Sequence, residues 1–220
     1  MSKIKGISAE LTERLNWLVC LGDLFSSYKK HKNDQFYKTI KKAEIHNPWF
    51  SEQNINTSIH YWQSKLKLKN INAWVSKYEI IETPPIKVGI VMAGNFPFAG
   101  LHDLICVIIS GNIALVKPSK SDKILIEYLI DYLWNKFPKS KHYIIKSEIL
   151  EEFDKVIATG SNNTFRYFEY YFSKKPNILR KSRTSVAILE NDTDKDSLCL
   201  LAKDIFLYFG LGCRNVSKLF

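Results

Sequence analysis

The segment around Cys213 has the residue types that a cysteine nucleophile requires. Gly210 and Gly212 precede the cysteine and leave room for a substrate, and the positive charge of Arg214 favours the thiolate over the thiol. An accessible thiolate can attack a carbonyl carbon and form a covalent intermediate. This local pattern supports a reactive Cys213 and a purely structural one about equally.

The other three cysteines lie in apolar runs of helical spacing, where we expect buried and unreactive thiols. They are Cys20, Cys106 and Cys199. The sequence has no Cys-x-x-Cys pair and no His-rich spacing, so it predicts no metal site. The N-terminal residues lack an apolar signal core, and no apolar run is long enough to span a bilayer. We therefore expect a cytoplasmic protein with reduced thiols.

A side-chain amide is expected at the turn that follows the apolar run Ile86–Ala93. Gly94 permits a tight turn there, Asn95 supplies the amide, and Pro97 fixes the start of the next helix. Open α/β sheets bind their ligands at such turns, which follow the carboxyl ends of strands. An asparagine in a turn, however, more often bonds its own backbone.

Two later turns contain residues suited to holding a phosphate or a ribose. The first contains Lys117, Ser119 and Lys120, and the second contains Thr159, Gly160 and Ser161. The second turn directly precedes a predicted helix, whose N-terminal N–H groups attract anions. Taken alone, the lysines are more simply explained as solvated side chains, and the second turn is not a Gly-x-Gly-x-x-Gly motif.

Predicted strands and helices alternate after the segment Thr83-Pro84-Pro85, and these elements must position the residues above. We expect strands at Ile86–Ala93, Asn112–Lys117, Tyr143–Lys146, Asp154–Thr159 and Ser185–Leu189. We expect helices at Phe98–Ser110, Asp122–Phe137 and Asn163–Ser173. Continuous apolar strands joined by helices are typical of a parallel sheet that is covered on both faces. The predicted fold is therefore α/β, with a doubly wound, mostly parallel sheet of Rossmann type.

Residues 1–83 have helical periodicity, and Ser8 followed by Leu11 indicates the start of a helix. We expect this region to pack as a helical cap on the sheet domain and to carry no chemistry.

The net charge of +10, from 32 Lys+Arg and 22 Asp+Glu, allows a nucleic acid or an anionic small molecule as partner. The lysines are spread along the chain in small groups: Lys29-Lys30, Lys41-Lys42, Lys65, Lys67, Lys69 and Lys174-Lys175. No aromatic-interleaved binding motif accompanies them, so we favour solvated faces over a nucleic-acid surface.

From Val88 to its end the chain resembles the aldehyde dehydrogenase superfamily, and above all its LuxC-type acyl-CoA or acyl-protein thioester reductases. The matching segments occur in the family's order: Gly94-Asn95-Phe96-Pro97, Gly111-Asn112 with Lys117-Pro118-Ser119, Thr159-Gly160-Ser161, and Gly212-Cys213. The resemblance implies that Cys213 is the nucleophile and that Asn95 helps to form the oxyanion hole. It also implies a cofactor site that comprises Gly94, Lys117, Ser119, Lys120, Thr159, Gly160 and Ser161.

Two departures from the family pattern refine this expectation. Aldehyde-oxidising members carry a Glu-Leu-Gly-Gly segment whose Glu activates water, but the corresponding stretch Leu179–Ser185 has no carboxylate. A reductase that starts from a thioester needs no such base. Many members that prefer NAD have Glu where this chain has Lys120, which would complement a 2′-phosphate. The resemblance therefore implies NADPH, with NAD as the alternative.

The implied activity is the NADPH-dependent reduction of a fatty acyl-CoA or acyl-carrier thioester to an aldehyde through a Cys213 acyl-enzyme. In the family the catalytic domain continues well past the nucleophile. We therefore expect an NADP-binding domain at residues 84–184 and a truncated start of the catalytic domain at residues 185–220, with little turnover from these residues alone. The alternative is an inactive nucleotide-binding or interaction module. Homo-oligomers are common in the family.

Overall fold

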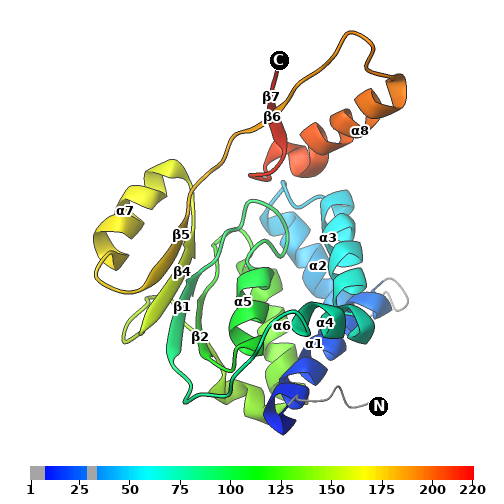
Figure 1. Ribbon diagram of the computed structural model, residues 1–220. Helices are drawn as coiled ribbons and strands as arrows, with labels where there is room; N and C mark the ends of the chain where they lie inside the picture. Colours follow the sequence, from blue (N-terminus) through cyan, green and yellow to red (C-terminus); the bar gives the residue numbers. More distant parts are fainter. Residues whose placement is uncertain (1–7, 29–33) are drawn as a thin grey trace.

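A five-stranded parallel sheet forms the centre of the protein (Figure 1). The computed structural model describes residues 8–28 and 34–220, and the Lys29-Lys30 pair lies outside the described residues. The strand order is β3-β2-β1-β4-β5, and every neighbouring pair runs parallel. The strands are β1 (Lys87–Val91), β2 (Ile113–Lys117), β3 (Ile144–Lys146), β4 (Lys155–Thr159) and β5 (Asn177–Arg180). The predicted doubly wound α/β fold is confirmed.

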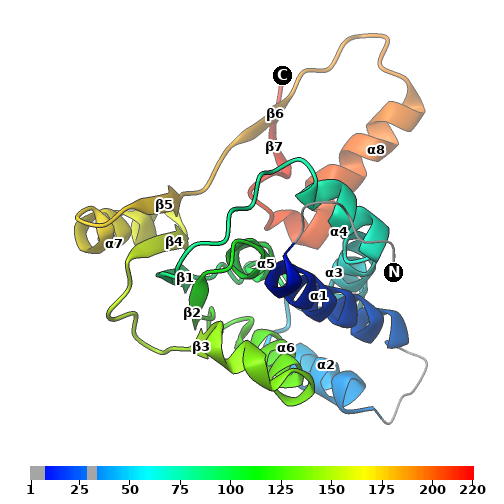
Figure 2. The same ribbon diagram turned by 60° about the horizontal axis from the view of Figure 1, so that its bottom comes forward.

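Helices cover both faces of this sheet. Figure 2 shows α7 on one side and α5 and α6 on the other. These helices are α5 (Leu101–Ile109), α6 (Lys123–Lys136) and α7 (Asn162–Phe172), and a short 3₁₀ helix, η1 (Pro138–His142), leads into β3. The central strands β1 and β2 are buried at their three middle positions, which is why their sequences are continuously apolar.

Four N-terminal helices pack against the face formed by α5 and α6. They are α1 (Ala9–Ser27), α2 (Gln35–His46), α3 (Glu52–Lys65) and α4 (Leu68–Val75). The predicted helix start is confirmed, because the Ser8 hydroxyl accepts the N–H of Leu11 at 2.9 Å.

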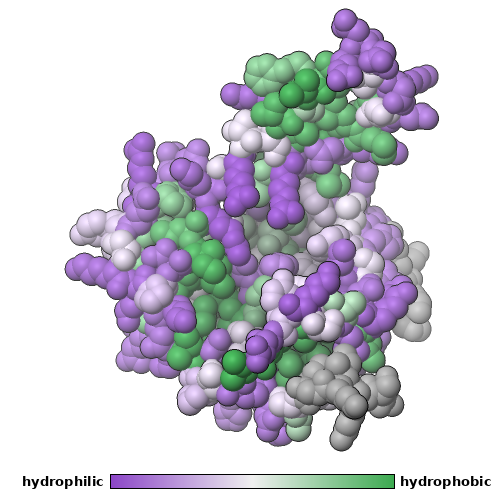
Figure 3. Space-filling model, viewed as in Figure 1, coloured by the Kyte–Doolittle hydropathy of each residue, from purple (hydrophilic) through white to green (hydrophobic). Residues whose placement is uncertain are grey.

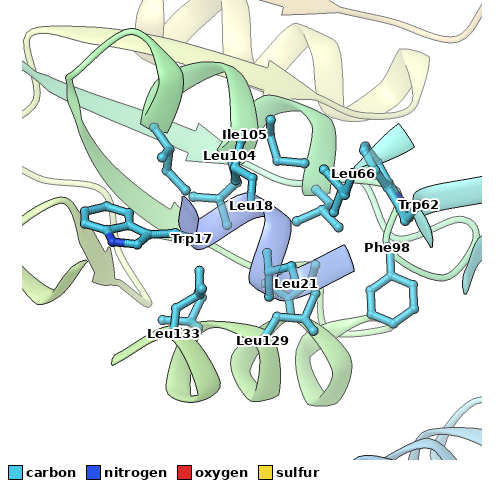
Figure 4. Packing of buried hydrophobic residues seen from close by; sticks show 14 of the residues in the cluster. Trp17, Leu18, Leu21, Trp62, Leu66, Phe98, Leu104, Ile105, Leu129 and Leu133 are labelled. Atoms are coloured by element: carbon cyan, nitrogen blue, oxygen red, sulfur yellow. The ribbon is translucent and has the colours of Figure 1, made fainter. Parts of the chain in front are cut away.

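Helix α1 carries the centre of the resulting hydrophobic core. Figure 4 shows Leu18 and Leu21 of α1 between Leu104 of α5 and the α6 residues Leu129 and Leu133. All five side chains are at most 1% exposed. The N-terminal helices and the sheet therefore share one core. The proposed boundaries at residues 84 and 185 stay a prediction.

Strand β5 was not predicted from the sequence. Among the described strands, Asn177–Arg180 pairs with β4 alone at the edge of the sheet, and its burial pattern runs from exposed to half-buried. Without a buried apolar run, such an edge strand gives little periodic signal.

Residues 185–220, which were predicted to begin the catalytic domain, form a unit separate from the main sheet. Strand β6 (Ser185–Ala187) pairs in parallel with β7 (Val216–Leu219) rather than with the main sheet. Helix α8 (Lys195–Phe206) and the 3₁₀ helix η2 (Leu207–Gly210) lie between these strands in the chain. Figure 1 shows this unit above the carboxyl edge of the sheet, and Figure 3 shows hydrophobic surface on it.

One prediction about this unit is wrong. Cys199 was expected to be buried, but it is exposed, and none of the residues of α8 is buried. Apolar spacing gives a helix a face that can be buried, but burial also needs a second surface. Within the described residues, α8 contacts mainly η2 and β7, and Leu200 and Phe206 remain 64% and 73% exposed.

Candidate active site

The three strand-end turns singled out by the sequence lie at one edge of the sheet. Strand β1 is the direct neighbour of both β2 and β4, and all three run in the same direction. Their carboxyl ends therefore lie side by side, below the unit that carries Cys213 (Figure 1). This is the edge at which open α/β sheets bind ligands.

The Asn95 turn contacts the segment that carries Cys213. The Asn95 side-chain amide donates to the carbonyl of Leu211 at 2.5 Å, two residues before the cysteine. The Phe96 ring stacks on Tyr208 with 4.6 Å between the ring centroids. The structure thus brings together two segments that are 116 residues apart in the chain. Their roles as oxyanion donor and nucleophile stay predictions.

The Cys213 loop is held by a buried asparagine that sequence reasoning missed. Cys213 itself is exposed, whereas Asn215 is only 8% exposed. The Asn215 amide donates to the carbonyls of Leu207, at 3.2 Å, and Asp204. A Cβ on Gly212 would lie 2.2 Å from Asn215 Oδ1, so any other residue at this position would displace the Asn215 side chain. The two glycines near Cys213 indicated room for substrate, but Gly212 also makes room for Asn215.

Gly94 allows the Asn95 turn to lie directly against the turn after β2. A Cβ at Gly94 would lie 2.3 Å from Ser119 Oγ and 2.4 Å from Ser119 Cβ, so no other residue fits without movement. Lys117 donates to the Glu148 carbonyl, and Lys120 is exposed. Two of the predicted cofactor residues, Gly94 and Ser119, are therefore in direct contact.

The turn after β4 combines a helix cap with an unpaired hydroxyl. Ser161 caps α7 by accepting the N–H of Thr164 at 3.3 Å, and the Gly160 N–H donates to Arg180 at 3.1 Å. Thr159 Oγ1 is buried without a hydrogen-bond partner among residues 8–28 and 34–220. A buried hydroxyl at a helix N-terminus fits a phosphate-bearing ligand. In the described part of the chain, no hydrogen bond joins this turn to the Asn95 turn or to Cys213.

A buried carboxyl lies behind the Asn95 turn, at Asp122. Its Cβ would be 3.5 Å from a Cβ on Gly94, and its backbone N–H donates to the Ser119 carbonyl at 3.1 Å. The sequence indicated Asp122 only as the start of a helix, yet its side chain makes no capping bond to α6. Burial raises the pKa of Asp122 well above its usual value, and the N–H groups of Phe98 and Ala99 only partly oppose this.

We expect Asp122→Asn to stabilise the protein more at pH 8 than at pH 4. Because the pKa of Asp122 is higher in the folded than in the unfolded protein, protonation of its carboxyl stabilises the folded state. This stabilisation is complete below the unfolded pKa of about 3.9 and is lost as the pH rises through the folded pKa. Asparagine is neutral at every pH, so the gain in Tm should reach roughly a few degrees at pH 8. Thermal unfolding at both pH values measures it, with the exposed Asp23→Asn as control. An equal gain at both pH values would contradict the assignment.

The other cysteines differ in burial. Cys20 is buried as predicted, and Cys106 is only partly buried. The Cys106 sulfur lies 3.7 Å from Nδ1 of His102, and the hydrogen bonds of His102 with Asp103 and Cys106 raise its pKa to about 9. The Asp103 carboxylate is also paired with Arg180 at 2.6 Å, which joins α5 to β5.

In the described part of the chain no three His, Cys, Asp or Glu side chains form a group able to hold a metal ion.

Solved structures with this fold include aldehyde dehydrogenases. An aldehyde dehydrogenase from Bartonella henselae superposes with a TM-score of 0.72 at 16% identity, covering 98% of this chain and 48% of that one. A succinate-semialdehyde dehydrogenase from Burkholderia pseudomallei gives 0.73 at 16% identity, covering 95% and 47%. An NADP-dependent enzyme from E. coli gives 0.73 at 16% identity, covering 98% and 48%. The protein therefore has the aldehyde dehydrogenase fold, and it spans about half the length of these structures.

The sequence narrows this class to one family. The pattern of the Acyl-CoA reductase (LuxC) family matches residues 63–220, which include the three strand-end turns and Cys213. The chain belongs to the LuxC acyl-CoA reductase family. A comparison with curated proteins finds no match. Over the described residues, no helix is both long and apolar enough to cross a bilayer.

Proposed function

We propose that the protein takes part in the NADPH-dependent reduction of a fatty acyl thioester, from coenzyme A or an acyl carrier, to an aldehyde. The observation that supports this most is the contact of the Asn95 amide with Leu211, beside the exposed Cys213. It holds a hydrogen-bond donor and a thiol in adjacent segments at the ligand-binding edge of the sheet. Residues 84–184 would bind the cofactor, and residues 185–220 would begin the catalytic domain.

The proposed chemistry starts at the Cys213 sulfur. The thiolate attacks the thioester carbonyl, a C–S bond to Cys213 forms, and the donor thiolate leaves. Negative charge develops on the carbonyl oxygen in this step and again when the acyl-enzyme is reduced. The Asn95 amide and the Cys213 N–H would stabilise that charge, once the amide has exchanged the Leu211 carbonyl for the substrate oxygen. Collapse of the resulting hemithioacetal releases the aldehyde and regenerates the thiolate.

The cofactor would lie along the three strand ends. Three features fit a ligand with ribose and phosphate groups: Ser119 against Gly94, the exposed Lys120, and the Thr159 hydroxyl, which has no partner among the described residues. NADPH bound there would supply the hydride, and the chain would supply alignment and charge stabilisation. The bond of Lys117 to Glu148 would have to open for Lys117 to reach the ribose.

The direct test is acyl-CoA-dependent oxidation of NADPH by the protein, with the aldehyde identified by mass spectrometry. We expect aldehyde in an amount equal to the NADPH consumed, because each hydride reduces one acyl group. Stabilisation by NADPH without any acyl-enzyme or aldehyde would contradict the proposal and favour an inactive nucleotide-binding module.

We expect Lys120→Glu to shift the cofactor preference from NADPH towards NADH. A carboxylate repels the 2′-phosphate and can accept hydrogen bonds from ribose hydroxyls, so the ratio of the two dissociation constants should change by roughly tenfold or more, about 1.4 kcal/mol. Titration with each cofactor measures the shift. Lys123→Glu is the control, because Lys123 pairs with Glu148 in the same region. Unchanged preference in Lys120→Glu would remove Lys120 from the site.

A further inference from the structure

The segment just before Cys213 has an unusual backbone conformation. Tyr208 and Phe209 have φ values of 51° and 57°, and Gly210 follows with φ of 73°. Left-handed conformations are uncommon for residues that have a Cβ, and they persist only where surrounding contacts enforce them. Two such residues in succession therefore require firm contacts on the side chains that they carry.

The N-terminal helix α3 provides one of these contacts. The Ser58 hydroxyl donates to the Tyr208 hydroxyl oxygen at 2.9 Å, across 150 residues of sequence. Ser58 is only 2% exposed and Tyr208 is half-buried, so the bond is partly shielded from water. Burial raises the pKa of Tyr208, and the hydrogen bond from Ser58 partly opposes this.

The same tyrosine also contacts the Asn95 turn. The Phe96 ring lies nearly parallel to the Tyr208 ring, at 16° between planes. Tyr208 is thus held by a hydrogen bond from α3 on its hydroxyl and by stacking on its ring. Phe209, the second left-handed residue, contacts Trp49 at 5.7 Å between ring centroids. Both strained residues are therefore anchored to the N-terminal helical region or to the turn beside it.

We propose that Ser58 is a positioning residue, which through Tyr208 sets the place of the Cys213 loop relative to the Asn95 amide. The proposal rests on the function proposed above. It assigns a role in the reaction to the helical region at residues 1–83, which the sequence indicated only as a cap. Ser58 acts through Tyr208 and need not touch the substrate.

The test is the rate at which Cys213 becomes acylated, followed by intact mass in single-turnover experiments with saturating acyl-CoA. We expect Ser58→Ala and Tyr208→Phe each to slow acylation by roughly threefold to tenfold, because each removes the same hydrogen bond. The double variant should be no slower than the slower single variant. The dissociation constant for NADPH should stay unchanged, since neither substitution alters a residue of the strand-end turns.

Thr57→Ala is the matched control. Thr57 is the neighbouring hydroxyl residue on α3, but it bonds to Gln53 of its own helix at 2.9 Å. We expect it to leave the acylation rate unchanged. A lowered Tm with an unaltered acylation rate in Ser58→Ala would show a merely structural hydroxyl and overturn the proposal. If the unsubstituted protein forms no acyl-enzyme, the proposed function fails, and the role of Ser58 fails with it.

Discussion

Replacement of Cys213 by alanine is expected to abolish acyl-enzyme formation and to leave NADPH binding unchanged. The sulfur is the only atom of the residue that can form the covalent intermediate, so the acyl-enzyme mass adduct should disappear. Apart from Gly94, the proposed cofactor residues lie in or directly after β2 and β4, and the substitution alters none of them. Intact mass after incubation with acyl-CoA, and titration with NADPH, measure the two effects separately.

Cys199→Ala is the control for this experiment, because Cys199 is equally an exposed thiol in the same C-terminal unit. We expect it to form the acyl-enzyme normally. A thioester adduct that persists in Cys213→Ala and disappears in Cys199→Ala would reverse the assignment of the nucleophile.

Asn95→Ala is expected to lower kcat by roughly a hundredfold to a thousandfold, about 2.7–4 kcal/mol, with little change in KM. The amide would bind the oxygen mainly when it carries charge, so its loss should act on the transition state rather than on substrate binding. Steady-state kinetics with a saturating thioester measure the effect.

The size of the effect separates two roles of Asn95. Its bond to the Leu211 carbonyl also anchors the Cys213 loop, and losing that anchor alone should cost about 0.5–1.5 kcal/mol, or at most roughly tenfold. A loss limited to this smaller range, similar to that of Ser58→Ala, would indicate that Asn95 only positions the loop. A loss of a hundredfold or more supports a direct role at the oxyanion.

The strand-end motifs were predictable because each depends on residues close together in the chain. The apolar runs before Gly94 and Lys117 correspond to β1 and β2, and the run before Thr159 corresponds to β4. Turn chemistry also marked the start of α1 at Ser8. The conformational preferences of neighbouring residues do not depend on distant contacts, so the folded structure keeps them.

Burial was less predictable than secondary structure. The sequence predicted three buried thiols besides Cys213, yet Cys199 is exposed and Cys106 only partly buried. Conversely, Asp122 is 1% exposed although aspartate ordinarily lies at the surface. Whether a side chain is covered depends on a second segment packing over it, and periodicity within one helix contains no information on that segment.

By itself the sequence determined which runs form the central strands and the helices between them, and which turns could hold a ligand, since neighbouring residues decide these features. It did not determine the boundaries: the strand predicted to end at Ala93 ends at Val91, and the helix predicted from Phe98 begins at Leu101. Only the tertiary structure decided that Ser58 meets Tyr208, that Asn95 reaches the Leu211 carbonyl and that Asp122 lies behind Gly94. These contacts join residues whose approach depends on how whole elements pack. For the same reason, the left-handed backbone at Tyr208 gave no local signal, because distant contacts hold it in place.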